Sequence, residues 1–312
     1  MRKVRYLQNE EIKKTKWDAC ITHAFNGNAY AYSWYLDIIF PGWGALVEED
    51  YVRVMPLPIK TKYTVSYCYQ PFFAQQLGVF SVSLLTPDIV TDFIKQIPAS
   101  VKLIDLNLNS LSAPDVGVYP VGESVNYLLD LIYEYPRIES KYKSNTKRNL
   151  KTALKSQLSL SKSLNHEEII TLFRNNRGQE VSKWGDEQYK TLSHLMYTAI
   201  FQGKGITYGV YNNFNELVSG AFFLKDNHRL IFLFSGTSGE GRETSALTFL
   251  IDSVIKEYSP SKLILDFEGS NNANLARFYA GFGAKETHYY RLKMNRLSPV
   301  GNILFKLVSR FR

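Results

Sequence analysis

The last quarter of the chain, residues 229–295, constrains the fold more than any other stretch. It reads as an apolar strand, a glycine-rich loop, an amphipathic helix, a second apolar strand that ends in carboxylates, a short helix and a final strand. Strands and helices that alternate in this way are typical of a sheet with helices packed on it. We therefore expect an α/β fold built on a mixed sheet.

The glycine-rich loop of this stretch runs Gly236-Thr-Ser-Gly-Glu-Gly-Arg-Glu-Thr-Ser245, directly before the amphipathic helix. Such a loop leaves unpaired backbone N–H groups at a helix N-terminus, where proteins bind anions and above all phosphates. Glycine permits the tight backbone, and arginine adds a fork of donors. We predict that this loop binds the phosphates of a donor substrate. The residues predicted to bind it are Gly236, Gly239, Gly241, Arg242, Thr244 and Ser245. The alternative is an ordinary flexible connection.

Two carboxylates come with the strand that follows the amphipathic helix. Asp266 and Glu268 are two residues apart, so the period of a strand places both on one face. An amine is protonated at neutral pH and must lose a proton before it attacks, and a positioned carboxylate can take that proton. We predict both as catalytic residues. The alternatives are that Asp266 caps the next loop or pairs with a lysine, and that Glu268 is not involved.

The remainder of the chain is long enough for a second domain. Of 312 residues, 45% are hydrophobic, which supplies material for two cores. The first half predicts a helix over 9–25, short strands within 43–59 and at 64–69, a helix over 86–97 and a strand over 101–108. Residues 109–123 are rich in proline and glycine and read as a connection. We predict domains over 1–123 and 124–297.

The second domain begins with a similar order of elements. A strand over 127–131 precedes helices over 144–158, 166–176 and 186–202, and a hairpin joins 206–211 to 217–225. Two loops have open interpretations. The aromatic and amide residues within 67–76 either line a cleft or form strand core and loop. In the loop 175–186, Arg177, Lys183 and Trp184 form the rim of an acceptor site, or Trp184 is buried and locks two helices together.

Charge and cysteine content narrow the class of protein. The net charge of +8 suits an anionic partner, although a basic protein with no such partner has the same charge. Cys20 and Cys68 are the only cysteines and have no metal-ligand spacing, so we expect no metal and a cytoplasmic location. No signal peptide or membrane span is apparent. The basic amphipathic tail, residues 298–312, either contacts an anionic membrane or caps the domain.

The segment Asn272-Ala-Asn-Leu-Ala-Arg-Phe-Tyr279-Ala-Gly-Phe-Gly283 resembles a pattern of the Gcn5-related N-acyltransferase (GNAT) superfamily, in which Asn, Tyr and Gly recur at this spacing. The wider arrangement resembles the FemABX-like branch, in which two GNAT-like domains lie in tandem. The segments that carry this second resemblance are 127–131 with 144–153, and 266–270 ahead of 276–279. The resemblance is good over 127–297 and faint over 1–108.

The resemblance implies a sheet that splays between its fourth and fifth strands to admit the donor. It implies that Tyr279 protonates the leaving group and that Asn272 contacts the backbone or the donor, while Asn272 as a helix cap and Tyr279 as a core residue are the alternatives. The implied activity is transfer of an acyl or aminoacyl group to an amine, possible acceptors being cell-envelope precursors. Acyl-CoA or aminoacyl-tRNA would be a co-substrate, with no tightly bound cofactor. A non-catalytic GNAT-like module that binds an anionic ligand or RNA is the alternative function.

Overall fold

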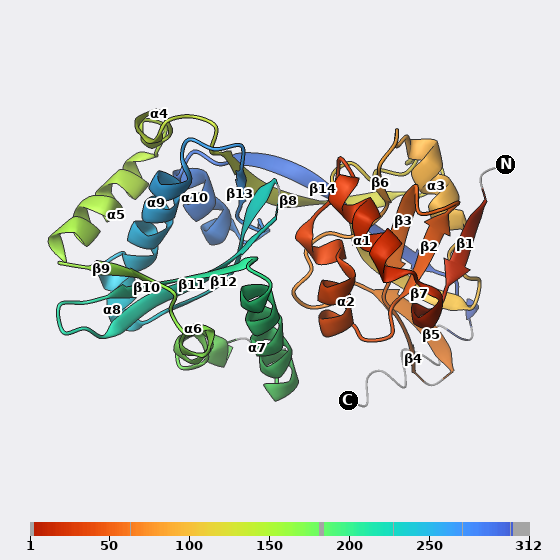
Figure 1. Cartoon of the computed structure of the whole chain (residues 1–312), viewed down its shortest axis with the longest axis horizontal. Coiled ribbons are helices and arrows are strands. Elements are labelled where there is room, and N and C mark those ends of the chain that lie inside the picture. The colour runs from red at the N-terminus through yellow and green to blue at the C-terminus, as the bar shows by residue number, and fades with distance from the viewer. Residues whose placement is uncertain are drawn as a thin grey trace. The chain divides into compact units, whose positions relative to one another are not determined.

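A computed structural model describes residues 3–62, 64–180, 184–226, 228–269, 271–299 and 301. The chain forms two compact units. Unit 1 combines Met1–Ser124 with the chain from Tyr289 onward, and unit 2 is Val125–His288. The domain division predicted from the sequence, by contrast, kept residues up to 297 in the second domain. Figure 1 shows the elements of both units.

Unit 1 contains two short sheets. Its helices and strands are β1 (Val4–Leu7), α1 (Lys14–His23), α2 (Ser33–Ile39), β2 (Gly44–Glu48), β3 (Arg53–Leu57), β4 (Ile59–Lys62), β5 (Val65–Tyr69), β6 (Phe80–Ser81), α3 (Pro87–Lys95), β7 (Val101–Leu108) and most of β14 (Lys285–Asn295). One sheet has the order β1-β2-β3-β6, and the other strands run β4-β5-β7-β14. Among the described strands of unit 1, β5 and β7 are the parallel pair, and α3 crosses between them.

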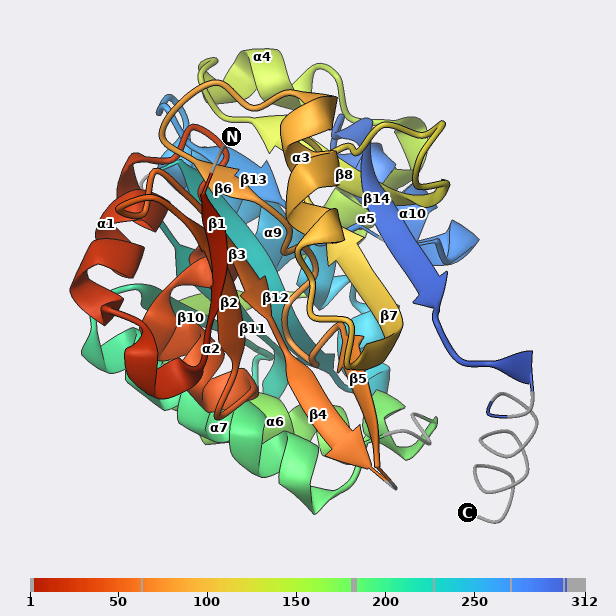
Figure 2. The same ribbon diagram turned by 90° about the vertical axis from the view of Figure 1, so that its right-hand side faces the viewer.

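A buried hydrophobic cluster of unit 1 joins α3 to strands of both sheets, and Figure 2 shows these elements. Pro87 occupies the first turn of α3, where its missing N–H costs nothing, and the apolar stripe of the helix faces inward. Ile104 on β7 and Leu292 on β14 belong to the same buried cluster. The last strand of the chain therefore completes the core of the first unit.

Unit 2 is built on a single mixed sheet. Its elements are β8 (Val121–Asp130), α4 (Tyr135–Glu139), α5 (Ser144–Lys155), β9 (Ser159–Lys162), α6 (His166–Arg174), α7 (Asp186–Phe201), β10 (Gly205–Tyr211), β11 (Leu217–Lys225), β12 (Arg229–Thr237), α8 (Gly239–Glu243), α9 (Ala246–Tyr258), β13 (Ile264–Asp266) and α10 (Ala273–Gly281). The strand order is β8-β13-β12-β11-β10-β9, and β12 and β13 are the parallel pair.

Helices cover both faces of this sheet (Figure 1). On one side α9 packs on β10 and β11 with α5 beside it, and on the other α6 packs on β11 and β12. The buried residues of α9 recur at helical spacing, with Leu250, Ile251, Val254 and Ile255 inside. The fold is therefore the α/β mixed sheet expected from the sequence.

Several predicted elements need correction. The helix expected over 9–25 is only Lys14–His23, because a short 3-10 turn at Asn9–Glu11 precedes it. The loop expected over 236–245 contains the helix α8. The sequence patterns also missed the short elements β1, α2 and β9, where too few residues repeat for a period to be recognised.

Candidate functional site

The two parallel strands of unit 2 separate soon after they pair. The register joins Arg229 to Ile264, Leu230 to Leu265 and Ile231 to Asp266, and β13 ends there. Meanwhile β12 continues to Thr237, paired with β11 as far as its end. The pairing between β12 and β13 therefore stops after three residue pairs, as the expected splay requires.

Beyond the last pair with β13, the backbone N–H groups of β12 point alternately toward β11 and away from it. The Ser238 N–H donates to the Val218 carbonyl on the β11 side, at 2.9 Å. Because N–H groups alternate in direction along a strand, those of Ser235 and Thr237 point to the side that β13 has left. A bulge at Leu233, where Phe222 pairs with Phe234 but Phe223 with Phe232, adds local twist.

Asp266 ends β13 and is almost fully buried. Its Oδ2 forms an ion pair with Arg229 Nη1 at 2.5 Å, and its Oδ1 accepts from Asn126 Nδ2 at 3.0 Å. The same Oδ1 accepts the Glu268 backbone N–H at 2.9 Å. Both oxygens of Asp266 therefore hold neighbouring segments in place, with arginine as the charge partner where the sequence had suggested a lysine.

Glu268 has a left-handed backbone, with φ of 51°. This conformation is uncommon for a residue other than glycine and costs roughly 1–3 kcal/mol, which the surroundings must offset. The hydrogen bond from its N–H to Asp266 is one such constraint. Strained residues of this kind cluster at functional sites, and the conformation fixes the direction in which the carboxylate leaves the end of β13.

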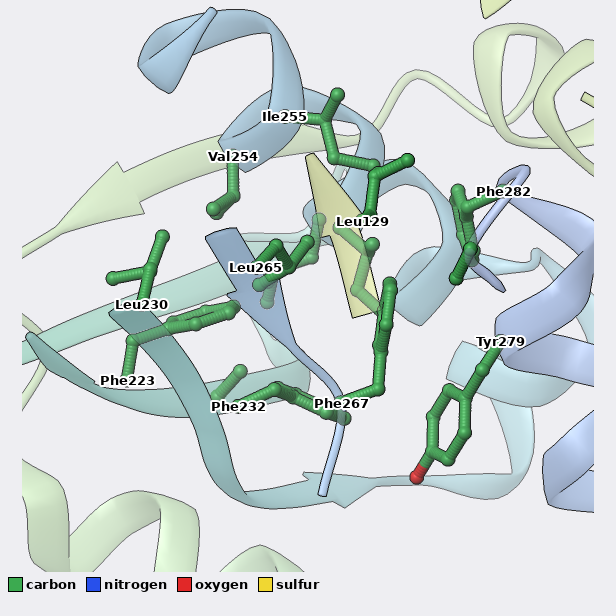
Figure 3. Close-up of a cluster of buried hydrophobic side chains, with 14 of the residues drawn as sticks. Leu129, Phe223, Leu230, Phe232, Val254, Ile255, Leu265, Phe267, Tyr279 and Phe282 are labelled. Carbon is green, nitrogen blue, oxygen red and sulfur yellow. The ribbon is translucent and has the colours of Figure 1, made fainter. Parts of the chain in front are cut away.

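Tyr279 lies on α10 at the margin of the unit 2 core. Its ring stacks on Phe267 with centroids 4.9 Å apart, and Figure 3 shows its hydroxyl pointing away from the labelled aliphatic side chains. Burial raises the pKa of Tyr279 to about 12, the negative charge of Glu268 adds to the rise, and the positive charge of Arg177 opposes it. The ring is thus part of the core, as the structural alternative held, while the hydroxyl is within electrostatic reach of Glu268.

The loop after α6 brings a cation to this hydroxyl. Arg177 begins a 3-10 turn, Arg177–Glu180, and acts on Tyr279 through its charge. Trp184 follows and stacks on Phe234 of β12, with centroids 5.9 Å apart. Trp184 therefore packs against the sheet, whereas Arg177, which sequence reasoning weighed but did not choose, acts on Tyr279 through its charge. Lys183 lies outside the described residues.

Two of the predicted phosphate-loop glycines are explained by close packing. A Cβ on Gly236 would lie 2.7 Å from the Ile169 carbonyl, and one on Gly241 would lie 2.1 Å from the Val218 carbonyl. Neither position can hold a larger residue without moving backbone. Gly239 differs, since the nearest atom to a Cβ there would be the tip of Arg242 at 3.9 Å.

Four backbone N–H groups of the predicted loop bond within the loop. The Gly241 N–H donates to Ser238 Oγ, and the N–H groups of Arg242, Thr244 and Ser245 donate to nearby carbonyls. The amides that begin α9, at Ala246–Thr248, have no acceptor inside a helix. Ser245 precedes them with a left-handed φ of 58°. Any anion at this end of the sheet would therefore meet the first turn of α9 and not the middle of the loop.

Asn272 caps α10, since its Oδ1 accepts the N–H groups of Asn274 and Leu275 at 2.9 and 3.3 Å. The capping alternative for Asn272 is confirmed, and the contact with a donor stays a prediction. Residues 300 and 302–312 of the basic tail lie outside the described residues.

Two further properties concern the described ranges alone. They contain no group of three or more His, Cys, Asp or Glu that could hold a metal ion. None of their helices combines the length and apolarity needed to cross a membrane.

No family model and no curated protein matches the sequence. Solved structures match nearly the whole chain. FemX aligns with a TM-score of 0.67 and 12% identity, over 97% of this chain and 99% of its own. L-PGS from Bacillus licheniformis aligns with a TM-score of 0.55 and 10% identity, over 95% of this chain and 96% of its own. A tandem GNAT protein from the clavulanic acid biosynthesis pathway aligns with a TM-score of 0.52 and 10% identity, over 95% of this chain and 99% of its own.

These likenesses and the splayed sheet define the class: the chain has the fold of two GNAT-like domains in tandem. The fold is similar to that of FemX over nearly the full length of both chains. The resemblance read from Asn272, Tyr279 and Gly283 is thereby confirmed at the level of the fold.

Proposed function

We propose that unit 2 is the catalytic centre of an N-acyltransferase that moves an acyl or aminoacyl group from an activated donor to an amine. The observation that carries this proposal is the separation of β12 from β13 after Ile231 and Asp266. A sheet that opens in this way offers backbone donors to a bound carbonyl without unfolding any strand. The fold shared with FemX and a tandem GNAT protein supports the same class of chemistry.

In this proposal the donor carbonyl binds along β12 beyond the splay. The backbone N–H groups of Ser235 and Thr237 face the side that β13 has left. A hydrogen bond from such an N–H group stabilises the negative charge that develops on the carbonyl oxygen during the reaction. The bulge at Leu233 sets the direction of these groups. Backbone donors need no reorganisation during the reaction, which is why they are effective here.

Glu268 is the proposed base that removes a proton from the attacking amine, directly or through water. Glu268 follows the last residue of β13 by two positions, beyond the last residue pair of β12 and β13, and this supports the proposed role. Asp266 is a positioning residue, because both of its oxygens hold Arg229, Asn126 and the Glu268 N–H. The Tyr279 hydroxyl, which keeps its proton at neutral pH, is the proposed acid for the leaving group.

The donor is acyl-CoA or aminoacyl-tRNA, and the phosphates of either would meet the start of α9. Since the loop amides of Gly241, Arg242, Thr244 and Ser245 are already bonded, the first turn of α9 is the proposed phosphate contact, with Arg242 close to it in sequence. An amine on a cell-envelope precursor is the proposed acceptor.

The test is a transfer assay with the full-length protein. Labelled acyl-CoA and labelled aminoacyl-tRNA are each offered with a panel of amine acceptors, among them cell-envelope precursors. Transfer by the wild type that Glu268→Gln abolishes supports the proposal. If the wild type binds neither donor, or if Glu268→Gln transfers at the wild-type rate, the proposed mechanism is wrong.

A further inference from the structure

Unit 1 has a sheet face that α3 does not cover. The cross-strand register aligns one row of side chains as Lys60, Tyr67, Leu103 and Asn295, and the next row as Tyr69, Asp105 and Lys293. Successive residues of a strand point to opposite faces, so these alternate residues lie opposite the α3 core, to which Cys68, Ile104 and Leu292 belong. We call this surface the tyrosine face (β4, β5 and β7 in Figure 2).

The tyrosine face is hollowed and carries two neighbouring rings. Lys62, Tyr67, Tyr69, Leu103, Lys293 and Asn295 line a hollow of about 600 Å³ together with Asp105. The rings of Tyr67 and Tyr69 have centroids 5.5 Å apart and planes only 30° apart. Both tyrosines are half-buried, which fixes their rings and leaves area for contact. Phe40 packs edge-on against the Tyr69 ring, with centroids 5.5 Å apart, and the ring area of the two tyrosines that stays exposed forms a platform on which flat groups can stack.

Cations border the platform on both sides. Lys62 is on β4, and Lys293 is on β14. Among the described residues that line the hollow, Asp105 is the only carboxylate, and Arg291 donates to its two oxygens at 2.6 and 2.7 Å. This pairing reduces the repulsion that Asp105 would exert on an anion. The charge balance of the face is therefore positive.

From this arrangement we infer that the tyrosine face binds a single-stranded stretch of nucleic acid. Bases stack on Tyr67 and Tyr69, and phosphates lie near Lys62 and Lys293. Strands are spaced by about 4.8 Å, so the strands that carry the two lysines are roughly 14 Å apart. That span exceeds one nucleotide, and a sheet with exposed aromatic residues stacks about two or three bases. A duplex, whose bases are already stacked, cannot use the rings.

The inference goes beyond the proposed transfer reaction, because the tyrosine face lies wholly in unit 1 and holds none of Asp266, Glu268 or Tyr279. The experiment is fluorescence anisotropy of the full-length protein with labelled oligonucleotides of about six nucleotides. RNA and DNA of one sequence are compared with the matching RNA duplex, between about 50 and 200 mM salt. The melting temperature of each variant is measured in parallel.

The wild type is expected to bind the single strands and to bind the duplex much more weakly. Tyr67→Ala should weaken binding at least about 5-fold, the lower limit for loss of one stacked base, whereas Tyr67→Phe should bind as the wild type does. Lys62→Ala and Lys293→Ala should each reduce the slope of affinity against salt by about 0.7. The control is Lys95→Ala, since Lys95 is a half-exposed lysine on α3. This variant should change neither the affinity for single strands nor its slope against salt.

Three results would overturn the inference. The first is that no single strand binds at the lowest salt concentration, and the second is that the duplex binds as tightly as the single strands. The third is that Lys62→Ala and Lys293→Ala bind like Lys95→Ala. The comparison of the two lysine variants with Lys95→Ala tests the inference even if Tyr67→Ala fails to fold. Binding of RNA, of DNA or of both supports the inference.

Discussion

Glu268 combines a strained backbone with a carboxylate at the end of β13, so the first prediction concerns this residue. Glu268→Gln keeps the size of the side chain and removes its basicity. We expect the rate of transfer to fall about 10²- to 10⁴-fold, which is the usual contribution of a general base. The melting temperature should change little. Steady-state kinetics with the donor found in the transfer assay, beside thermal unfolding, measure both.

Tyr279 provides a prediction on pH. Burial and the charge of Glu268 hold the pKa of its hydroxyl near 12, so the proton stays on through neutral and mildly alkaline pH. Replacement of Glu268 by glutamine removes a negative charge that disfavours the tyrosinate, so the pKa of Tyr279 should fall, while burial keeps it above its usual value. Titration by NMR of protein with labelled tyrosine measures this, and Tyr279→Phe identifies the signal. An unchanged pKa would mean that the two groups are not close.

At the scale of residues, the sequence indicated which residues to choose as candidates better than it indicated what each of them contacts. Asp266 and Glu268 could be chosen because two carboxylates after an apolar strand are conspicuous. The pairing of Asp266 with Arg229 and Asn126 could not be predicted, since these partners are far apart in the sequence and meet only in the sheet. Arg177 was weighed and passed over for the same reason.

Among the elements, the loop between β12 and α9 gives a matched pair of glycine variants. Gly241→Ala would place a Cβ 2.1 Å from the Val218 carbonyl, so we expect unfolding to become easier by about 1–3 kcal/mol, as in overpacked cores. Gly239→Ala meets open space and should stay within about 0.5 kcal/mol of the wild type. Melting temperatures of the two variants compare them. Equal stability would contradict the packing described for Gly241.

β13 provides a second prediction for the elements. Asp266→Asn removes the charge of Asp266 from its ion pair with Arg229, and breaking a buried pair costs roughly 3–5 kcal/mol. Because a quarter of the Arg229 side chain is exposed, we expect a cost below that range. Hydrogen exchange of the Glu268 amide, which donates to Asp266, should quicken in the same variant. Slow exchange at Glu268 would show that Asp266 does not hold this turn.

The long elements were predictable because their apolar periods extend over several turns. The α9 stripe is one case, with Leu250, Ile251, Val254 and Ile255 all buried as expected. The helix α8 was missed because it has five residues, three of them glycine or arginine, and no apolar period. The splay itself leaves no mark on periodicity, and only the resemblance to known folds indicated it.

In the whole molecule, the chain returns to unit 1 after unit 2. Leu292 on β14 is fully buried in the unit 1 core, so Leu292→Ala should destabilise this unit by about 2–5 kcal/mol. The control is Met294→Ala, a partly buried neighbour on the same strand. Hydrogen exchange should quicken in β7, the partner strand, and not in β10 or β11. Faster exchange confined to unit 2 would contradict this assignment of β14.

The return of the last strand also limited what the sequence could predict for the whole chain. Residues 109–123, rich in proline and glycine, suggested a boundary close to Ser124, where the first segment of unit 1 ends. The pairing of β14 with β7 joins residues far apart in the sequence, and apolar alternation does not name a partner strand.

The central claim is that the donor lies where β12 and β13 part, and protection of a cysteine tests it most directly. Both native cysteines are buried, and burial raises the pKa of Cys20 to about 12, so neither should react quickly. Ser235→Cys places a thiol on β12 beyond the splay, and Thr152→Cys on α5 is the control. The account predicts that a bound donor slows alkylation at 235 and leaves 152 unaffected. Equal alkylation at 235 with and without a saturating donor would contradict it.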